Sequence, residues 1–286
     1  MIGLAERRQC FAEEIEVASN VRTSALVDAL ATVPRERFLP PGPWTIRGEA
    51  DFQAPARQTR DADPRHLYHN VAVAIDPSRL LFNGAPGLLA TAIDALALDR
   101  GRRALHIGTG TGYYTALIAH IVGEAGRVVG LEVDDALARQ ARTNLAAQPW
   151  IDVRHADGTG HLDGPFDAML VNAGVTHLQA TWLEALADGG RIVFPLTATT
   201  PAMTTIGKGF LVLASRTSDR HTMTARIITF VAIYSGLGLR DEALNAQLGA
   251  AMTQSPYPPV KRIRLDPHDP SASCWHHAST ACLSLA

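Results

Sequence analysis

The chain has 286 residues, of which 47% are hydrophobic, enough to bury a substantial core. Its 26 Lys and Arg against 28 Asp and Glu give a formal net charge of -2, which argues against a dedicated nucleic-acid binder. Three cysteines make a disulfide framework improbable, and neither a secretion signal nor an apolar run long enough to span a membrane is present. We expect a globular cytoplasmic protein with no nucleic-acid or membrane partner.

The N-terminal part, residues 1–86, is predicted to hold two helices and a long loop. Apolar spacing indicates both helices within residues 5–38, with Thr23 as N-cap of the second and Pro34 ending it. Residues 39–76 are rich in Pro, Gly, Arg, Asp and His and show neither helical nor strand periodicity. We interpret them as an ordered, functional loop.

Residues 87–238 are predicted to form an α/β domain. A helix starts at Pro86 and carries Leu89, Ile93 and Leu96 on one face. Helices then alternate with strands expected at 104–107, 127–132, 151–155, 166–171 and 191–194. This alternation implies a doubly wound, mostly parallel sheet. Two or three antiparallel strands after Pro195 would close one edge, and residues 239–286 would form a tail.

The stretch "ALHIGTGTGYYTA" places three glycines directly after the first strand of this domain. Ligands of open parallel sheets bind past the carboxyl ends of the strands, where such turns lie. The spacing GxGxG differs from the dinucleotide fingerprint GxGxxG, so it favours a ligand without a pyrophosphate. Glu132 ends the second strand, where a carboxylate can accept both hydroxyls of a ribose, and Asp157 ends the third, within reach of an adenine amino group. Alternatively, the glycines form only a tight turn and Glu132 is a solvated strand end.

The ordered motifs "VPRERFLP", "ALHIGTGTGYYTA", "LEVDD", "ADGTG", "PFDAMLVNAG" and "LEALADGGRIVFPL" resemble the protein-L-isoaspartate O-methyltransferases, over roughly residues 5–215. The resemblance implies a Rossmann-like methyltransferase fold with S-adenosyl-L-methionine as cofactor. His106 stands where that family usually has an acidic residue. By the resemblance, the cofactor-binding residues are His106, Gly108, Thr109, Gly110, Gly112, Glu132, Val133, Asp157, Gly158 and Asn172.

The substrate loop departs from the family pattern, in which a Ser or Thr, one further residue and a Pro precede the first long helix. Here the matching stretch is "LLFNGAPGLLA": Pro86 is kept, but Gly84 occupies the hydroxyl position. Asn83 could donate its amide to a substrate carboxylate, or Asn83 and Gly84 could form only a turn, since this pair favours positive φ. Asn83, Gly84 and Pro86 are therefore the candidate catalytic residues.

The absence of an obvious triad or carboxylate pair fits a carboxylate acceptor, which is already anionic at pH 7 and needs no general base. The leading hypothesis is a carboxyl O-methyltransferase acting on a protein or peptide. A second is a methyltransferase of the same fold acting on a small metabolite or natural product. For a hydroxyl or amine acceptor, His66, His69 and His177 are the candidate bases. A third hypothesis is a non-catalytic cofactor-binding module.

The tail contains "CWHHASTAC", with two Cys and two His in a short span. Its spacing matches no standard zinc site, and adjacent histidines close a tetrahedron poorly. We predict no metal site: Trp275 should anchor the tail, and Cys274 and Cys282 should be small buried apolar residues.

Overall fold

The structure is a computed structural model that describes residues 3–48 and 55–285. Its contacts divide the chain into two compact units. The first unit comprises Met1–Gly101 and Thr109–His155, and the second comprises Arg102–Gly108 and Ala156–Ala286. Within the described residues, no helix is both long and apolar enough to cross a bilayer.

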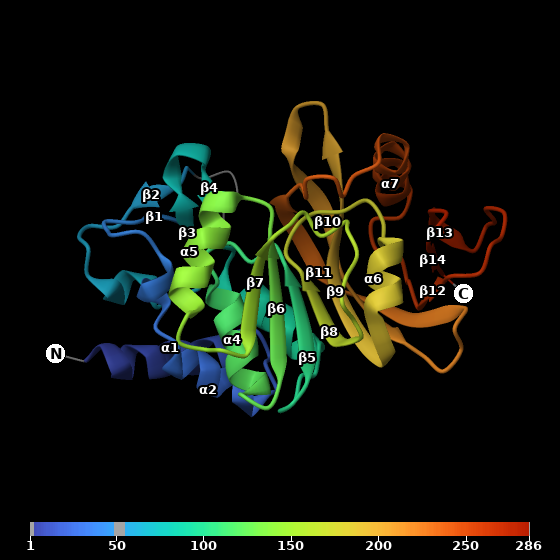
Figure 1. Cartoon of the computed structure of the whole chain (residues 1–286). Coiled ribbons are helices and arrows are strands. Elements are labelled where there is room, and N and C mark those ends of the chain that lie inside the picture. Colours follow the sequence, from blue (N-terminus) through green and yellow to red (C-terminus); the bar gives the residue numbers. More distant parts are fainter. Residues whose placement is uncertain (1–2, 49–54, 286) are drawn as a thin grey trace. The chain divides into compact units, whose positions relative to one another are not determined.

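In the part of the first unit that the structure describes there are five α-helices. They are α1 (Leu4–Ala18), α2 (Ser24–Thr32), α3 (Pro86–Ala95), α4 (Tyr113–Val122) and α5 (Asp135–Leu145). α1 packs against α2 (Figure 1), and α2 also contacts α3 and α4. Thr23 occupies the N-cap position of α2, as predicted, but its side chain makes no capping bond; its backbone N–H donates to Asp94 Oδ1 at 2.8 Å.

Helix α3 confirms the periodicity argument. Pro86 lies in its first turn, and Leu89, Ile93 and Leu96 are all buried. Two parallel strands, β6 (Arg127–Glu132) and β7 (Ile151–His155), complete the α/β part of this unit, and both contact α5.

The segment expected to be an irregular loop contains a small sheet, so that expectation was wrong in part. β1 (Thr45–Gly48), β2 (Arg57–Gln58), β3 (Val71–Asp76) and β4 (Leu81–Phe82) pair antiparallel in the order β2-β1-β3-β4. Three 3-10 helices, η1 (Arg35–Phe38), η2 (Pro64–Leu67) and η3 (Pro77–Arg79), flank these strands. The sheet encloses a core of Trp44, Ile46, Leu67 and Val73. Strands this short give too few alternations for a period to be recognised.

The second unit begins with a parallel arrangement. β5 (Arg103–Ile107) pairs with β8 (Phe166–Val171), which pairs with β9 (Leu186–Thr200). The helix α6 (Ala180–Ala185) connects β8 to β9. Such strands joined through helices confirm the predicted α/β class.

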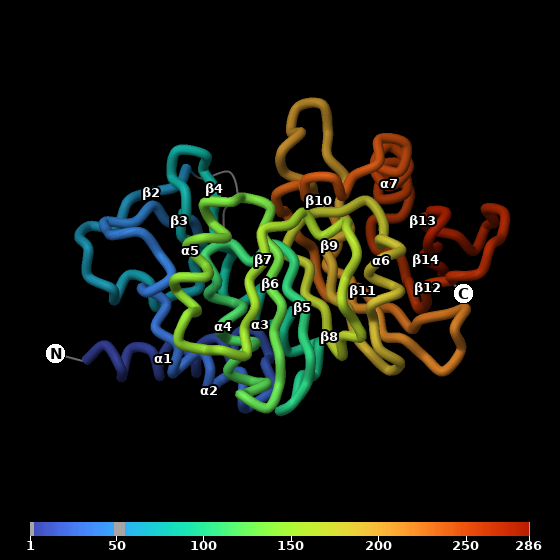
Figure 2. Tube along the Cα trace, viewed as in Figure 1, coloured from blue at the N-terminus to red at the C-terminus, as the bar shows by residue number. Residues whose placement is uncertain are grey.

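The antiparallel part is longer than predicted. β10 (Met203–Arg216) and β11 (Thr222–Tyr234) follow β9 as long neighbouring strands (Figure 2). After α7 (Glu242–Gln254), the tail adds β12 (Arg262–Arg264), β13 (Cys274–His277) and β14 (Cys282–Ser284). The order across this unit is β13-β14-β12-β11-β10-β9-β8-β5. The boundaries of the three predicted domains stay a prediction.

Candidate active site

The glycine turn has a left-handed backbone at each of its three glycines. Gly108, Gly110 and Gly112 have φ angles of 82°, 58° and 101°, in the left-handed region that other residues rarely adopt. Gly112 is the N-cap of α4, and a Cβ there would lie 2.9 Å from Leu145 Cδ1 of α5. The turn therefore brings the N-terminus of α4 against α5 with no room for a side chain.

Glu132 is held at the end of β6 by two backbone groups. Its side chain is 7% exposed; Oε2 accepts the Gly110 N–H at 2.7 Å, and Oε1 accepts the Asp134 N–H at 3.0 Å. A carboxylate oxygen has two acceptor sites, so each oxygen keeps one for a further donor. Glu132 thus fixes the glycine turn to the strand end and can still accept two hydroxyls.

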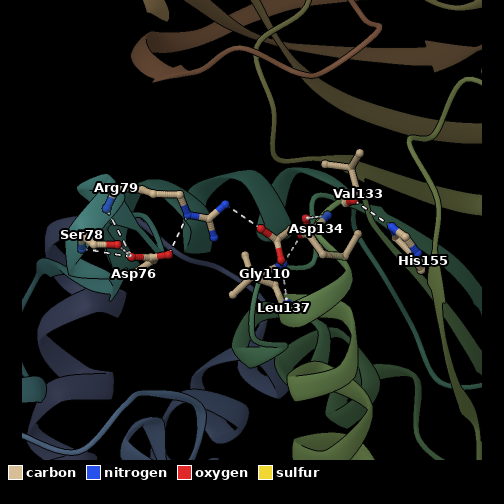
Figure 3. Close-up of polar contacts among 9 residues, drawn as sticks. Asp76, Ser78, Arg79, Gly110, Val133, Asp134, Leu137 and His155 are labelled. Carbon is tan, nitrogen blue, oxygen red and sulfur yellow. Dashed lines mark hydrogen bonds and ion pairs between the residues drawn. The ribbon is translucent and has the colours of Figure 1, made fainter.

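An arginine that the sequence analysis did not single out lies beside this turn. Arg79 in η3 donates through Nε to Asp76 Oδ2 and through Nη1 to Asp134 Oδ2, each at 2.6 Å (Figure 3). Hydrogen bonds from Ser78 and Arg79 lower the pKa of Asp76 to about 2. A Cβ at Gly110 would lie 3.5 Å from Ile75 Cδ1, which places the same segment next to the turn. No sequence motif surrounds Arg79, so its position beside the glycine turn becomes evident only in the structure.

Val133 follows Glu132 and presents an apolar side chain that is 39% exposed. Its carbonyl oxygen lies 3.0 Å from His155 Nε2 (Figure 3). An exposed apolar side chain at a strand end is suited to contact a flat aromatic ligand ring.

The second unit carries the other predicted cofactor residues, at the carboxyl end of β5. The Asn172 N–H donates to Ile107 O at 2.8 Å, and a Cβ at Gly108 would lie 2.9 Å from Asn172 O. Gly158 has φ 77°, and a Cβ there would lie 2.9 Å from Ile107 Cγ2. Trp182 Nε1 donates to Gly158 O at 2.8 Å. Gly108, Gly158 and Asn172 are thus brought together around Ile107.

Asp157 is exposed, and its Oδ1 accepts both the N–H and the hydroxyl of Thr159 at 2.9 Å. These bonds lower its pKa, so it is anionic at neutral pH. Thr109 is buried and donates its N–H to Leu131 O.

His106 is fully buried on β5, and burial lowers its pKa to about 3. It is therefore neutral at pH 7 and does not supply the negative charge that an acidic residue would.

We expect His106 to make the protein less stable in acid. The unfolded histidine binds a proton near pH 6.5, while the folded one does not until about pH 3. The free energy of unfolding therefore has its full contribution from the neutral, buried His106 above pH 6.5. Below pH 6.5 it falls by up to about 1.4 kcal/mol per pH unit. Urea unfolding at pH 7.5 and 5 should show a flatter pH dependence for His106→Gln than for the wild type.

The variant His161→Gln, at a side chain that is 87% exposed, controls for the loss of a histidine as such. Equal pH slopes for His106→Gln and the wild type would contradict a neutral, buried His106.

The Asn83–Gly84 pair of the substrate loop lies in a turn, while a contact of Asn83 with substrate stays a prediction. Gly84 has φ 82°, so the pair does form a turn. Asn83 is 9% exposed, and its Oδ1 accepts the Val73 N–H at 3.0 Å. Its Nδ2 is buried without a hydrogen-bond partner among residues 3–48 and 55–285. A buried donor without a partner is costly, so this amide keeps an unused hydrogen-bonding capacity inside the loop.

Two side chains from the sequence motifs fix this loop. Tyr114 of α4 donates its hydroxyl to Gly84 O at 3.0 Å. Arg35, from "VPRERF", is fully buried and donates to Leu67 O and Val71 O, each at 2.6 Å; its Nη2 lies 3.5 Å from Asn83 Oδ1. Arg35 therefore orients the Asn83 amide, a role that the motif alone did not reveal.

A cationic cavity of about 600 Å³ lies in the 39–76 segment that the sequence analysis interprets as a functional loop. Its lining residues are Ile46, Arg57, Thr59, Arg60, Arg65, His66, His69 and Val71. His66 Nε2 lies 2.8 Å from Asp61 Oδ1. His177, the third candidate base, lies in the second unit beside Thr176 and Gln179. Asp61 and Asp63 pair with Arg65 at 2.9 and 3.3 Å and offset part of the positive charge, while the arginines of the lining still favour an anionic ligand.

Comparisons with known proteins give the family and the fold relatives of this chain. The family described as Protein-L-isoaspartate(D-aspartate) O-methyltransferase (PCMT) matches residues 59–229. The chain is 35% identical over 198 residues to Protein-L-isoaspartate O-methyltransferase 1 of Rhodopseudomonas palustris, covering 68% of this chain and 70% of that one. It is 32% identical over 189 residues to Protein-L-isoaspartate O-methyltransferase 1 of Archaeoglobus fulgidus, covering 62% and 84%. A solved protein-L-isoaspartate O-methyltransferase superposes with a TM-score of 0.60 at 20% identity, covering 86% of this chain and 69% of that one, which shows the shared fold.

Proposed function

Because this chain belongs to the protein-L-isoaspartate(D-aspartate) O-methyltransferase family, we propose that it methylates isoaspartyl carboxylates of proteins or peptides with S-adenosyl-L-methionine. The single observation that carries the proposal is the glycine turn tied to Glu132, in a chain that matches the family over residues 59–229.

The reaction needs positioning more than acid or base chemistry. When bound, S-adenosyl-L-methionine would supply an electrophilic sulfonium methyl group to a substrate carboxylate, giving a methyl ester and S-adenosylhomocysteine. The carboxylate charge and the sulfonium charge are both lost, and no proton moves. Desolvation and alignment of the two reactants can therefore supply most of the acceleration.

The residues take roles that their contacts support. Glu132 accepts the ribose hydroxyls through its remaining acceptor sites, and Val133 contacts the adenine ring. Gly108, Thr109, Gly110 and Gly112 give the ligand close access to backbone. His106, Asp157, Gly158 and Asn172 complete the cofactor set that we propose.

On the acceptor side, we propose that the Asn83 amide donates to the substrate carboxylate, replacing the hydroxyl usual in the family. The turn at Gly84 and Pro86 would hold that amide in place. The cationic cavity supports an acceptor with acidic neighbours, because arginines attract anionic peptide segments.

The test compares an isoaspartyl peptide with the same peptide containing ordinary aspartate. We expect base-labile methyl ester on the isoaspartyl peptide alone, with one S-adenosylhomocysteine formed per ester. Cofactor binding without transfer to either peptide would reject the proposed acceptor and leave the other two hypotheses.

A small metabolite or natural product as acceptor is the second candidate, favoured by Gly84 in place of a hydroxyl. A non-catalytic cofactor-binding module is the third. Substrate-dependent formation of S-adenosylhomocysteine excludes the third, and transfer to a small carboxylic acid but not to the isoaspartyl peptide supports the second.

Restoring a hydroxyl at position 84 should not improve the enzyme. A Cβ there would lie 2.8 Å from Leu89 Cδ2 of α3, and φ 82° is strained for any L side chain. We expect Gly84→Ser to lower the free energy of unfolding by roughly 1–3 kcal/mol and to leave isoaspartyl methylation no higher than in the wild type. Urea unfolding and the peptide assay measure the two effects.

Gly189→Ser is the matched control, because Gly189 has φ 72° and open space where its Cβ would lie. It separates backbone strain from the contact with Leu89. A stable Gly84→Ser variant with tenfold higher activity would mean that the loop accepts the family's hydroxyl after all.

A further inference from the structure

The strands of the tail bring together four side chains of metal-binding type. One ligand atom from each of His268, Cys274, His277 and Cys282 lies within 4.8 Å of the others. Cys274 and His277 are the first and last residues of β13, Cys282 begins β14, and His268 precedes β13. All four belong to the second unit.

A β-bulge puts the two β13 ligands on one side of the strand. In a regular strand, residues three apart face opposite sides. Here Cys274 pairs with Ser284 but His276 with Leu283, so β13 has one extra residue between them. A bulge of this kind re-aims side chains. His277 lies directly opposite Cys282 in the pairing.

The intervening side chains point to other partners. Trp275 is buried and stacks edge-on with Phe210 at a centroid distance of 5.7 Å, which confirms the predicted anchor. His276 Nε2 lies 2.7 Å from Thr176 O. Only one of the two adjacent histidines, His277, belongs to the cluster. The sequence-based argument that adjacent histidines close a tetrahedron poorly therefore does not apply. His268, outside that stretch, supplies the fourth ligand.

Hydrogen bonds from neighbouring groups orient the side chains of the cluster. His268 Nδ1 lies 2.7 Å from Asp266 O, which assigns its proton to Nδ1 and leaves the Nε2 lone pair 3.5 Å from Cys274 Sγ. A histidine that ligates metal commonly donates its other N–H to a carbonyl in this way. The Ser271 N–H donates to Cys274 Sγ at 3.4 Å. His277 Nδ1 is buried with no hydrogen-bond partner among the described residues.

We propose that His268, Cys274, His277 and Cys282 bind one structural zinc ion. Two thiolates and two imidazoles in a tetrahedron are a ligand set typical of zinc, and four protein ligands leave no open position for catalysis. Zinc–sulfur and zinc–nitrogen bond lengths put tetrahedral ligand atoms about 3.3–3.8 Å apart. The cluster needs to contract by only about 1 Å to reach that geometry.

The ion would stabilise strands that are otherwise too short to be stable. β12, β13 and β14 have three, four and three residues. Their pairing is short, with three residue pairs between β12 and β14 and three between β13 and β14. Zinc would cross-link β13, β14 and the segment before them. The β13–β14 hairpin also contacts the loop after β8: His276 Nε2 lies close to Thr176 O, and the Thr280 hydroxyl donates to Leu178 O at 2.8 Å.

Metal analysis of the purified full-length chain tests the proposal. After growth with zinc and exhaustive dialysis, we expect about one zinc per chain, with Cys274 and Cys282 resistant to alkylation until a chelator is added. Replacement by cobalt(II) should give the visible spectrum of a tetrahedral thiolate site. This measurement needs no variant and no methyltransferase activity, so its result is independent of the proposed function.

Variants assign the ligands. Cys274→Ser, Cys282→Ser and His268→Gln should each lose at least nine-tenths of the zinc, whereas Cys10→Ser, at an exposed cysteine, should keep it. Three outcomes overturn the proposal: a Cys274–Cys282 disulfide in the dialysed wild type, two freely reactive thiols with less than a tenth of an equivalent of zinc, or iron in place of zinc.

Discussion

Replacing Glu132 by alanine is expected to weaken S-adenosyl-L-methionine binding at least tenfold. The cofactor would lose two hydrogen bonds to a carboxylate, each worth roughly 1.5–3 kcal/mol. The glycine turn would also lose its tie to β6, because Oε2 holds the Gly110 N–H at 2.7 Å. Isothermal titration with the cofactor and with S-adenosylhomocysteine measures the change.

The same substitution should lower stability, since Glu132 is nearly buried and satisfies two backbone N–H groups. Leaving a buried donor without a partner costs about 1–3 kcal/mol. Glu132→Gln keeps the size of the side chain and one oxygen acceptor, so it should unfold less readily than Glu132→Ala while still binding cofactor weakly.

Asp135→Ala is the matched control. It removes a carboxylate three positions further along, in the first turn of α5, where Asp135 pairs with Arg139 and does not reach the glycine turn. We expect near-normal cofactor affinity. A folded Glu132→Ala variant with unchanged affinity would show that Glu132 is a structural residue only.

The sequence predicted the parts of the fold that depend on neighbouring residues. The glycine turn and the helix α3 follow from spacing within one element, and the structure places them as expected. Glu132 was predicted from its place at a strand end, but its two bonds to backbone N–H groups were not, because they depend on how the turn folds back.

Features assembled from distant segments escaped prediction. Arg35 reaches Asn83 through a separation of 48 residues, and Arg79 reaches Asp134 through 55. No local pattern encodes such contacts. The tail shows the same limit: its cysteines were interpreted as buried apolar residues, yet only Cys282 is fully buried. A bulge in β13 and the more distant His268 build the cluster, and neither is readable from spacing.

A methyl group at Gly108 is expected to destabilise the protein more than one at Gly110, although both glycines belong to the same turn. At Gly108, with φ 82°, the new Cβ would lie 2.9 Å from Asn172 O and 3.2 Å from Asn172 C. Both are backbone atoms, and the Asn172 N–H is already bonded to Ile107 O, so the segment cannot retreat without breaking that bond. We expect Gly108→Ala to lower the free energy of unfolding by at least about 3 kcal/mol.

At Gly110, with φ 58°, the nearest atom to the new Cβ would be Ile75 Cδ1 at 3.5 Å, an ordinary contact. Gly110→Ala should therefore cost only the strain of a left-handed alanine, roughly 1–2 kcal/mol. Urea unfolding of both variants, compared at equal m-values, separates the two effects. Both variants carry the strain of a left-handed alanine, and only Gly108→Ala adds the steric clash. Equal losses for the two variants would mean that the Asn172 carbonyl does not approach Gly108 closely. Packing against Gly108 would then no longer explain why Asn172 lies beside the glycine turn.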